Sequence, residues 1–401
     1  MLRLAAIVAL AYSASALSVV TPENDDQFPL FTIDYDTKPR DRFKEVSTHY
    51  RDNIVEVFNV AMDEIPNFVS DFFKLVHGIW WVLHHEKYEE LLGIVDAVNH
   101  PNVTISNVVM VNCLYELEGW CTSIIAKQTN GTILHSRNLD FHIQQMRDNT
   151  YRARFTKGGN YLYDAVMFAG NVGVYTGMKE GAFSISQNTR APNKHYVGVI
   201  ENLIMLFTGF REQSWIIRDS LESCGDWDCA YDKLRNEPFN ALGYIILAGV
   251  KDDEGVVISR KRFGPAHEDF LNTTNGTWYV VQANHDHWAD GCKDRCAAAS
   301  ESLDNLGQDA LDINTLRESV LEVPPVLNKK TIYNTQFIPS LDFKNSIPLD
   351  YNETAQPLEG KWSDYKDDIP DLKIGEIFEG ITYEQFFLDM MMVLMDPKVA
   401  Q

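Results

Sequence analysis

The chain has 401 residues, of which 45% are hydrophobic and 23% are charged. This length and composition are typical of a folded protein with a substantial core, and they exclude a fibrous, collagen-like or largely disordered protein. The formal net charge of −22 would repel the phosphate backbone of nucleic acids, so we expect no nucleic-acid partner.

The first sixteen residues have the three parts of a secretory signal peptide. Arg3 supplies the basic end, residues 4–12 form a short apolar run, and residues 14–16 fit the small-x-small cleavage rule. The apolar run is too short to cross a bilayer. We therefore predict a signal peptide over 1–16 and a lysosomal or secreted protein. Five Asn-x-Ser/Thr acceptors agree with this route: Asn102, Asn130, Asn272, Asn275 and Asn352.

A strand is expected at 28–36, and residues 38–112 are predicted to be mainly helical. The most apolar part, residues 68–85, contains the adjacent Trp80 and Trp81. Such a segment can be buried core, or it can lie at a membrane–water boundary, where tryptophan is common. Both interpretations stay open, and the second makes a membrane surface an expected partner.

From residue 121 the sequence changes to short β-branched runs with helical segments between them. The predicted strands are 121–129, 132–140, 151–156, 161–168, 172–175, 182–186, 243–249, 255–259 and 277–283. The predicted helices are 196–209, 212–223 and 311–322. This order favours an α+β fold with layered, largely antiparallel sheets. The acidic tail from about 341 ends in an apolar helical run at 381–397, which can dock on the domain or contact a membrane or partner.

The six cysteines lie in a chain predicted to enter an oxidising compartment. Two pairs are close enough in sequence to suggest disulfides: Cys224 with Cys229, and Cys292 with Cys296. Cys113 and Cys121 would then be left over. They could pair with each other, or one of them could be a working thiol.

The Asn-Gly dipeptide at 130–131 is typical of a two-residue β-hairpin turn. Such a turn pairs Thr129 with Thr132 and, in the same register, sets Cys121 opposite Asp140. Directly opposed residues share one face of a sheet, so we expect the carboxylate beside the thiol.

The same register sets Arg137 opposite Ile124, on the face away from Cys121. Arg137 would join the cluster only through a bulge or bend near Ser136, and bulges are common beside active sites. In this register, Arg137 therefore reaches the thiol only if the strand is irregular at this position.

A cut before Cys121 would give an N-terminal cysteine with a free α-amine. The pKa of such an amine is ordinarily about 7.7 to 8.0, so it can take the thiol proton. Asp140 could then hold the amine, and Arg137 could stabilise developing negative charge. The thiol could itself attack the carbonyl of Trp120 and release the upstream segment. The alternative is a purely structural Cys121, as a buried thiol or half-cystine.

The segment CTSII at 121–125, followed by RNLD at 137–140, resembles the acid ceramidase and N-acylethanolamine acid amidase family of N-terminal-nucleophile hydrolases. Further segments resemble the family in the same order over about residues 28–340: FTIDYDTKPRDRF (31–43), FAGNVGVYTG (168–177), GVVISRKRFGPA (255–266), TWYVVQANHDHW (277–288) and PVLNKKTIYNT (325–335).

The resemblance implies a lysosomal amidase of N-acyl lipids that needs no cofactor and is cut into α- and β-subunits from one precursor. It implies a layered αββα core with antiparallel sheets, preceded by a helical α-subunit segment. The expected division is a signal peptide (1–16), an α-subunit segment (17–120), a catalytic β-subunit (121–340) and an acidic extension (341–401).

The resemblance also assigns roles to particular residues. Cys121 would be the nucleophile, exposed by self-cleavage, with Arg137 and Asp140 to orient and activate it. The remaining assignments are Asn284 as a donor to the oxyanion, Arg295 as an active-site arginine and Asn188 as a second polar contributor. Thr189 stands where the family often has glutamate, so no role of that glutamate is carried over.

Two other functions compete with this one. The first is a zinc site with nitrogen and sulfur ligands: His285, His287, Cys292 and Cys296. The second is a secreted lipid-binding protein without enzymatic activity, whose lipid binding would be indifferent to replacement of Cys121.

Overall fold

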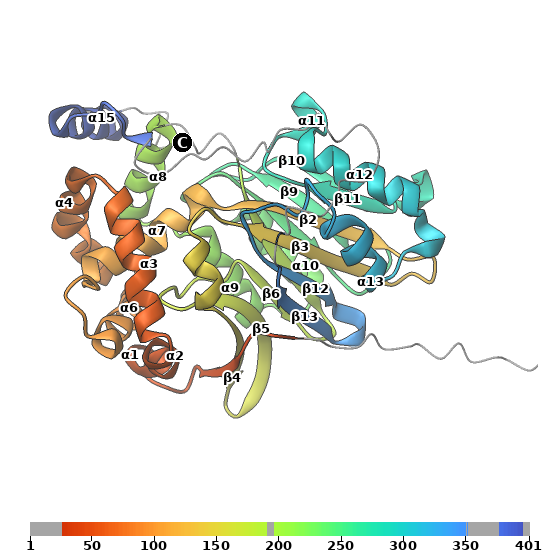
Figure 1. The fold of residues 1–401 in the computed structure, drawn as a ribbon, viewed down its shortest axis with the longest axis horizontal. Coiled ribbons are helices and arrows are strands. Elements are labelled where there is room, and N and C mark those ends of the chain that lie inside the picture. Colours follow the sequence, from red (N-terminus) through yellow and green to blue (C-terminus); the bar gives the residue numbers. More distant parts are fainter. Residues whose placement is uncertain (1–25, 191–195, 350, 352–376, 396–401) are drawn as a thin grey trace, which may run out of the picture.

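The computed structural model describes residues 26–190, 196–349, 351 and 377–395. The predicted signal peptide and most of the acidic tail lie outside these residues. Two stacked β-sheets form the centre, with helices on both outer sides (Figure 1). This arrangement confirms the predicted α+β class with layered sheets.

The larger sheet has eight strands in the order β1-β4-β5-β6-β7-β8-β9-β10. Its strands are β1 Leu30–Asp34, β4 Thr150–Lys157, β5 Asn160–Phe168, β6 Thr176–Lys179, β7 Phe183–Thr189, β8 Gly243–Ala248, β9 Gly255–Arg260 and β10 Pro265–Phe270. Only β1 with β4 is a parallel pair; the other neighbours are antiparallel.

The smaller sheet has five antiparallel strands in the order β11-β2-β3-β12-β13. They are β2 Trp120–Lys127, β3 Ile133–Asp140, β11 Tyr279–Gln282, β12 Thr331–Ile338 and β13 Phe343–Pro348. The last strand lies within the segment expected as an acidic extension, so the sheet includes the start of that segment.

The helices form two groups around the sheets. Before β2 come α1 Pro39–Arg42, α2 Lys44–His49, α3 Arg51–Glu64, α4 Asn67–Val76, α5 Gly78–Leu83, α6 His85–Val98 and α7 Ile105–Glu118. After it come α8 Tyr196–Phe207, α9 Gln213–Ser223, α10 Trp227–Asn236, α11 His287–Asp290, α12 Asp294–Leu306, α13 Ile313–Leu316 and α15 Tyr383–Met395. Short helical turns are η1 Gln144–Asn149, η3 Thr273–Asn275, η4 Gln308–Ala310, η5 Arg317–Leu321 and η6 Pro339–Leu341.

The strand predicted at 172–175 is wrong. The Asn171 side chain accepts a hydrogen bond from the backbone N–H of Gly173 at 2.6 Å, and the Val174 N–H donates to the Ser214 carbonyl at 3.1 Å. This segment is therefore bound to the start of α9 instead of a neighbouring strand, and β6 begins only at Thr176. Strands β10 and β13 and helices α10 and α12 were not predicted.

The apolar segment 68–85 divides between the two interpretations given for it. Phe73 and Trp80 are fully buried, whereas Trp81 is 51% and Val82 is 70% exposed. The segment therefore supplies core on one side and an apolar surface on the other.

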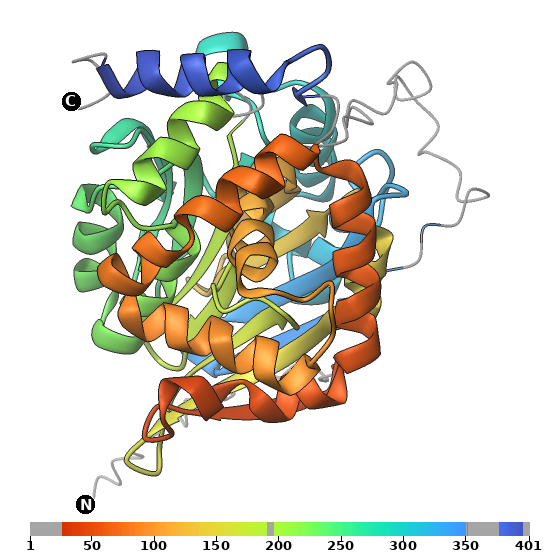
Figure 2. The same ribbon diagram turned by 90° about the vertical axis from the view of Figure 1, so that its left-hand side faces the viewer.

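The terminal apolar run is helical, as predicted, and docks on the domain as α15. Figure 2 shows it along the edge of the N-terminal helices. The ring of Phe386 packs against Phe68 and Phe72 of α4, with centroid distances of 5.1 and 5.8 Å. Its outer face exposes Leu388 and Met392, so this helix has an apolar side in contact with the domain and another in solvent.

Replacing Gly93 with alanine will lower the free energy of unfolding by about 1–3 kcal/mol. Helices α1 and α6 pack so closely that a Cβ at Gly93 would lie 2.0 Å from the carbonyl oxygen of Arg40. Urea denaturation measures the loss. Gly78→Ala is the matched control, because a Cβ on that helical glycine meets nothing within 4 Å. Equal stabilities for the two variants would contradict the close approach.

Candidate active site

The β2–β3 hairpin has a longer turn than the two-residue turn predicted for it. The Gln128 N–H donates to the Thr132 carbonyl at 2.9 Å, and the Gly131 N–H donates to the Gln128 carbonyl at 2.9 Å. Gly131 has a φ of 92°, the left-handed conformation that ends a three-residue hairpin loop. The predicted register is therefore wrong by one residue.

This change of register decides which side chains meet the thiol. Asp140 pairs with Trp120 instead of Cys121, and Arg137 pairs with Ser123. Because Cys121 and Ser123 are two residues apart on one strand, their side chains share a face, and Arg137 lies on the same face. The bulge that the predicted register required is absent, since the β2–β3 pairing has no register shift.

The thiol of Cys121 is buried against a guanidinium group. Arg137 Nη2 donates to Cys121 Sγ at 2.6 Å, while its Nη1 donates to the Tyr175 carbonyl at 3.1 Å and to Thr176 Oγ1 at 2.7 Å. Burial raises the pKa of the Cys121 thiol above its usual value, and the positive charge of Arg137 only partly offsets this effect. In the uncut chain the thiol therefore keeps its proton and needs a base to become a nucleophile.

Asn284 contacts the backbone on both sides of Trp120. It follows β11, and its Oδ1 accepts a hydrogen bond from the Cys121 N–H at 2.9 Å. Its Nδ2 donates to the carbonyl oxygens of Thr189 at 2.6 Å and of Gly119 at 3.4 Å. This side chain therefore fixes the segment that a self-cleavage reaction would cut.

Arg295, in the first turn of α12, connects the other polar groups of the site. Its Nη1 donates to the Cys121 carbonyl at 2.7 Å and to Thr122 Oγ1 at 2.9 Å, and it lies 3.2 Å from Asp140 Oδ2. Its Nη2 donates to Asn284 Oδ1 at 2.8 Å. One guanidinium thus holds the backbone of the thiol residue, the carboxylate and the amide.

Asp140 is fully buried and has two further partners that the sequence did not reveal. Its Oδ1 accepts from Thr331 Oγ1 at 2.7 Å, and its Oδ2 accepts from Asn328 Nδ2 at 3.0 Å. Burial raises the pKa of Asp140, against the charge of Arg295 and these two hydrogen bonds. Asn328 and Thr331 lie in the segment 325–335, where only the family resemblance pointed to any importance.

The comparisons with known proteins agree with this geometry. The chain is 34% identical over 340 residues to the N-acylethanolamine-hydrolyzing acid amidase of Rattus norvegicus, covering 83% of this chain and 91% of the rat protein. It is also 30% identical over 337 residues to the acid ceramidase of Rattus norvegicus, covering 77% of this chain and 82% of that protein. The chain belongs to the N-acylethanolamine acid amidase and acid ceramidase family.

Two further comparisons support this membership of the acid amidase family. A family model described as the beta subunit of N-acylethanolamine-hydrolyzing acid amidase matches residues 26–85. The solved structure of the Caenorhabditis elegans N-acylethanolamine-hydrolyzing acid amidase ortholog matches with a TM-score of 0.51 and 35% identity, covering 55% of this chain and 93% of that chain. The predicted family and the predicted N-terminal-nucleophile hydrolase fold are confirmed.

Five of the six residues that the acid amidase family resemblance assigned to the site lie around the Trp120–Cys121 bond: Cys121, Arg137, Asp140, Asn284 and Arg295. Asn188 contacts residues next to this group and not the group itself. Its Oδ1 accepts from Ser123 Oγ at 2.7 Å, and its Nδ2 donates to the carbonyls of Gln282 at 2.7 Å and Ala283 at 3.2 Å. It therefore holds the segment that ends in Asn284 and does not itself reach the thiol. The role of each side chain stays a prediction.

Two disulfides are present, and they are the two that the spacing suggested: Cys224 with Cys229, and Cys292 with Cys296. Cys113 and Cys121 are outside these disulfides, and both are buried.

The bond between Cys292 and Cys296 uses the two sulfur atoms that the alternative zinc site required, and His287 Nε2 lies 3.2 Å from Asp269 Oδ2. Three of the four proposed zinc ligands, Cys292, Cys296 and His287, are thus engaged elsewhere.

The residues after Asn284 are tied to the larger sheet through Asp286. Arg190 donates to both of its carboxylate oxygens, at 2.7 and 2.6 Å, and Tyr244 donates its hydroxyl at 2.7 Å. Burial alone would raise the pKa of Asp286, but the hydrogen bonds from Arg190 and Tyr244 lower it below its usual value. This carboxylate therefore stays ionised in mildly acidic solution.

Replacing Asp286 with asparagine will lower the thermal midpoint at pH 6 and at pH 4.5 by similar amounts. A carboxylate whose pKa is lowered on folding stabilises the protein above its unfolded pKa, about 3.9, and this contribution is lost as the pH falls through the lower folded value. The difference from wild type should therefore shrink only below about pH 3.9. Asp52→Asn, at an exposed carboxylate, is the control. A difference that is already lost at pH 4.5 would contradict the ion pair with Arg190.

Proposed function

We propose that the protein is a lysosomal or secreted amidase that hydrolyses the amide bond of N-acyl lipids, N-acylethanolamines or ceramides, to a fatty acid and an amine. The observation that carries this proposal is the environment of Cys121: a guanidinium 2.6 Å from its sulfur and an amide that binds its backbone nitrogen. The relatives named for these two activities support the choice of substrate class.

Activation begins with the uncut Trp120–Cys121 bond. The Cys121 thiol attacks the Trp120 carbonyl, the thiol proton passes to the Cys121 nitrogen, and the C–N bond then breaks to leave a thioester. Water hydrolyses the resulting thioester. The products are an upstream piece that ends at Trp120 and a catalytic piece whose first residue is Cys121.

In turnover the freed α-amine takes the thiol proton, and the thiolate attacks the amide carbonyl of the lipid. Arg137 stabilises the thiolate, and Asn284 with backbone N–H groups stabilises the tetrahedral oxyanion. The ammonium then protonates the departing amine of the lipid. Water hydrolyses the acyl-thioester, which releases the fatty acid and restores the thiol.

Asp140 and Arg295 hold this machinery in position. In the uncut chain the nitrogen of Cys121 already points to Asn284 Oδ1, which Arg295 also contacts. After the cut, the same oxygen accepts a hydrogen bond from the new ammonium group. The carboxylate of Asp140, which pairs with Arg295, balances the added positive charge.

Because the substrates are lipids, we expect the enzyme to act at a membrane surface. Within the parts of the chain that the structure describes, no helix is long and apolar enough to span a bilayer. The exposed Trp81 and Val82 of α5, and Met391 and Met392 on α15, can instead rest on the lipid boundary. We propose that these side chains bring the enzyme to lipids that are dissolved in the bilayer.

Hydrolysis of defined lipids tests the proposed activity. Purified protein is incubated at about pH 4.5 with an N-acylethanolamine or with a ceramide in detergent micelles, and free fatty acid is measured by mass spectrometry. Wild type should release fatty acid from at least one of them and Cys121→Ala from neither. Lipid that is bound by both proteins but hydrolysed by neither would instead support the lipid-binding alternative.

A further inference from the structure

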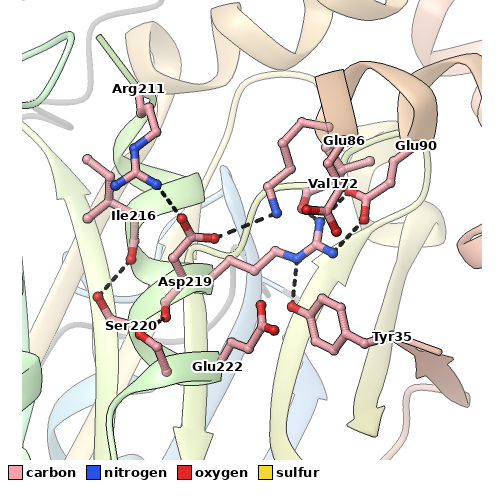
Figure 3. A network of polar contacts seen from close by, with 12 residues as sticks. Tyr35, Glu86, Glu90, Val172, Arg211, Ile216, Asp219, Ser220 and Glu222 are labelled. Atoms are coloured by element: carbon pink, nitrogen blue, oxygen red, sulfur yellow. Dashed lines mark hydrogen bonds and ion pairs between the residues drawn. The ribbon is translucent and has the colours of Figure 1, made fainter. Parts of the chain in front are cut away.

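A buried ion pair joins the two sides of the proposed cut. Glu90, labelled in Figure 3, lies in α6, before Cys121 in the chain. Arg218 lies in α9, after Cys121. Arg218 Nη1 donates to Glu90 Oε2 at 2.6 Å, and its Nη2 donates to Oε1 at 2.7 Å. Both side chains are 0% exposed. This is the geometry of a two-point guanidinium–carboxylate contact shielded from water.

The remaining partners of this pair also come largely from residues before the cut. Arg42 donates to Glu90 Oε1 at 2.8 Å, and Arg218 Nε donates to the Tyr35 hydroxyl at 3.1 Å. Arg218 Nη1 also donates to the carbonyl of Val172 at 3.0 Å. The carboxylate that compensates Arg218 therefore belongs to the upstream piece.

A second ion pair crosses the same boundary beside the first. Lys87 Nζ in α6 lies 3.7 Å from Asp219 Oδ1 in α9. Arg211 contacts the same carboxylate (Figure 3). Helices α6 and α9 thus meet through charges of both signs. The apolar core also runs across the boundary, but it cannot discriminate between acidic and neutral solution as charges do.

The carboxylate of this contact is kept ionised in acid. Burial by itself would raise the pKa of Glu90, but the positive charges of Arg218, Lys87 and Arg42 hold it below its usual value. A carboxylate of this kind stabilises the folded arrangement above its unfolded pKa and loses this effect only as the pH falls through the lower folded value. The contact therefore persists in an acidic compartment.

We propose that Glu90 and Arg218 are the clasp that keeps the upstream piece bound to the catalytic piece after self-cleavage, in acidic as well as in neutral solution. The inference rests on the proposed self-cleavage, because the clasp has this task only once the chain is in two pieces. Removing one partner would leave the other charge buried without compensation, which strongly weakens such contacts. Replacing both by apolar side chains removes that cost.

Size-exclusion chromatography of the cleaved protein tests the clasp. Wild type should elute at pH 4.5 and at pH 7 as one species that contains both pieces on a denaturing gel. Glu90→Gln should lose most of the upstream piece from that species at both pH values. Asp96→Asn is the matched control, because Asp96 pairs with Arg40 on an exposed surface of the same piece and should keep both pieces together.

Two further variants separate dissociation from misfolding. The uncut Cys121→Ala chain with Glu90→Gln should stay folded by circular dichroism, since the peptide bond still holds its two halves. The double variant Glu90→Met with Arg218→Met should retain the upstream piece better than either single variant. Retention of the upstream piece in cleaved Glu90→Gln would overturn the clasp alone, and so would a double variant that retains this piece as fully as wild type does. A wild-type chain that stays whole would overturn the clasp together with the proposed self-cleavage.

Discussion

Replacing Arg137 with methionine will slow both self-cleavage and lipid hydrolysis by about 100-fold or more. The Arg137 guanidinium donates to Cys121 Sγ at 2.6 Å and is the positive charge nearest to the forming thiolate in the described contacts. Methionine has a similar length and leaves no buried charge, so the fold should survive. Single-turnover rates of cleavage and initial rates of fatty acid release measure the effect.

Two controls separate charge from shape at Arg137. Lysine at this position keeps a positive charge but cannot bind the thiol, the Tyr175 carbonyl and Thr176 at once, so its activity should fall between those of wild type and the methionine variant. Thr176→Val removes one anchor of the guanidinium and should cost less than the loss of Arg137 itself. Rates within threefold of wild type for the methionine variant would exclude a role in the chemistry.

Replacing Arg295 with methionine will lower the free energy of unfolding by about 3–5 kcal/mol and will also abolish self-cleavage. The change leaves the carboxylate of Asp140 buried without its ion-pair partner, and it releases the backbone of Cys121 and the amide of Asn284. Burial already raises the pKa of Asp140, and the loss of Arg295 would raise it further. The destabilisation should therefore be greatest at neutral pH and smaller as Asp140 takes a proton in acid.

Urea denaturation in a Cys121→Ala background measures this loss, because that chain stays in one piece. A second change, Asp140→Asn, should return most of the stability, since it removes the uncompensated charge. It should not restore cleavage when Cys121 is present. If the Arg295 variant is as stable as its parent at pH 7, the ion pair with Asp140 does not stabilise the fold.

The hairpin shows where sequence reasoning stops. The Asn-Gly dipeptide correctly predicted a turn between two strands, but Gly131 serves equally well as the left-handed residue of a three-residue loop. This single added residue moved Asp140 from Cys121 to Trp120 and brought Arg137 to the thiol. Local sequence specifies that a turn forms, whereas packing between the sheets decides its register.

The contacts between distant parts of the chain also depend on packing and not on local sequence. The family resemblance pointed to Cys121, Arg137 and Asn284, which the structure brings together. Nothing in the local pattern pointed to the pairing of Glu90 with Arg218, which are 128 residues apart. Such pairs depend on how helices and sheets are stacked, and a single sequence contains no period or spacing that reveals them.

Strand β10 and helix α12 were not predicted because their own sequences carry weak signals. Strand β10, with the sequence PAHEDF, contains none of the β-branched residues that mark strands, and it forms by pairing along β9. Helix α12 follows a Gly-Cys turn and carries many small residues, so its sequence shows only a faint apolar periodicity. Both elements gain their stability from neighbours in the folded protein.

The most direct test of the account is the intact mass and N-terminal sequence of purified protein held at about pH 4.5, beside Cys121→Ala. The account predicts a new N-terminus at Cys121 in wild type and an uncut chain in the variant. A wild-type chain that stays whole, or a cut that appears equally in both proteins, would contradict a self-activating cysteine amidase.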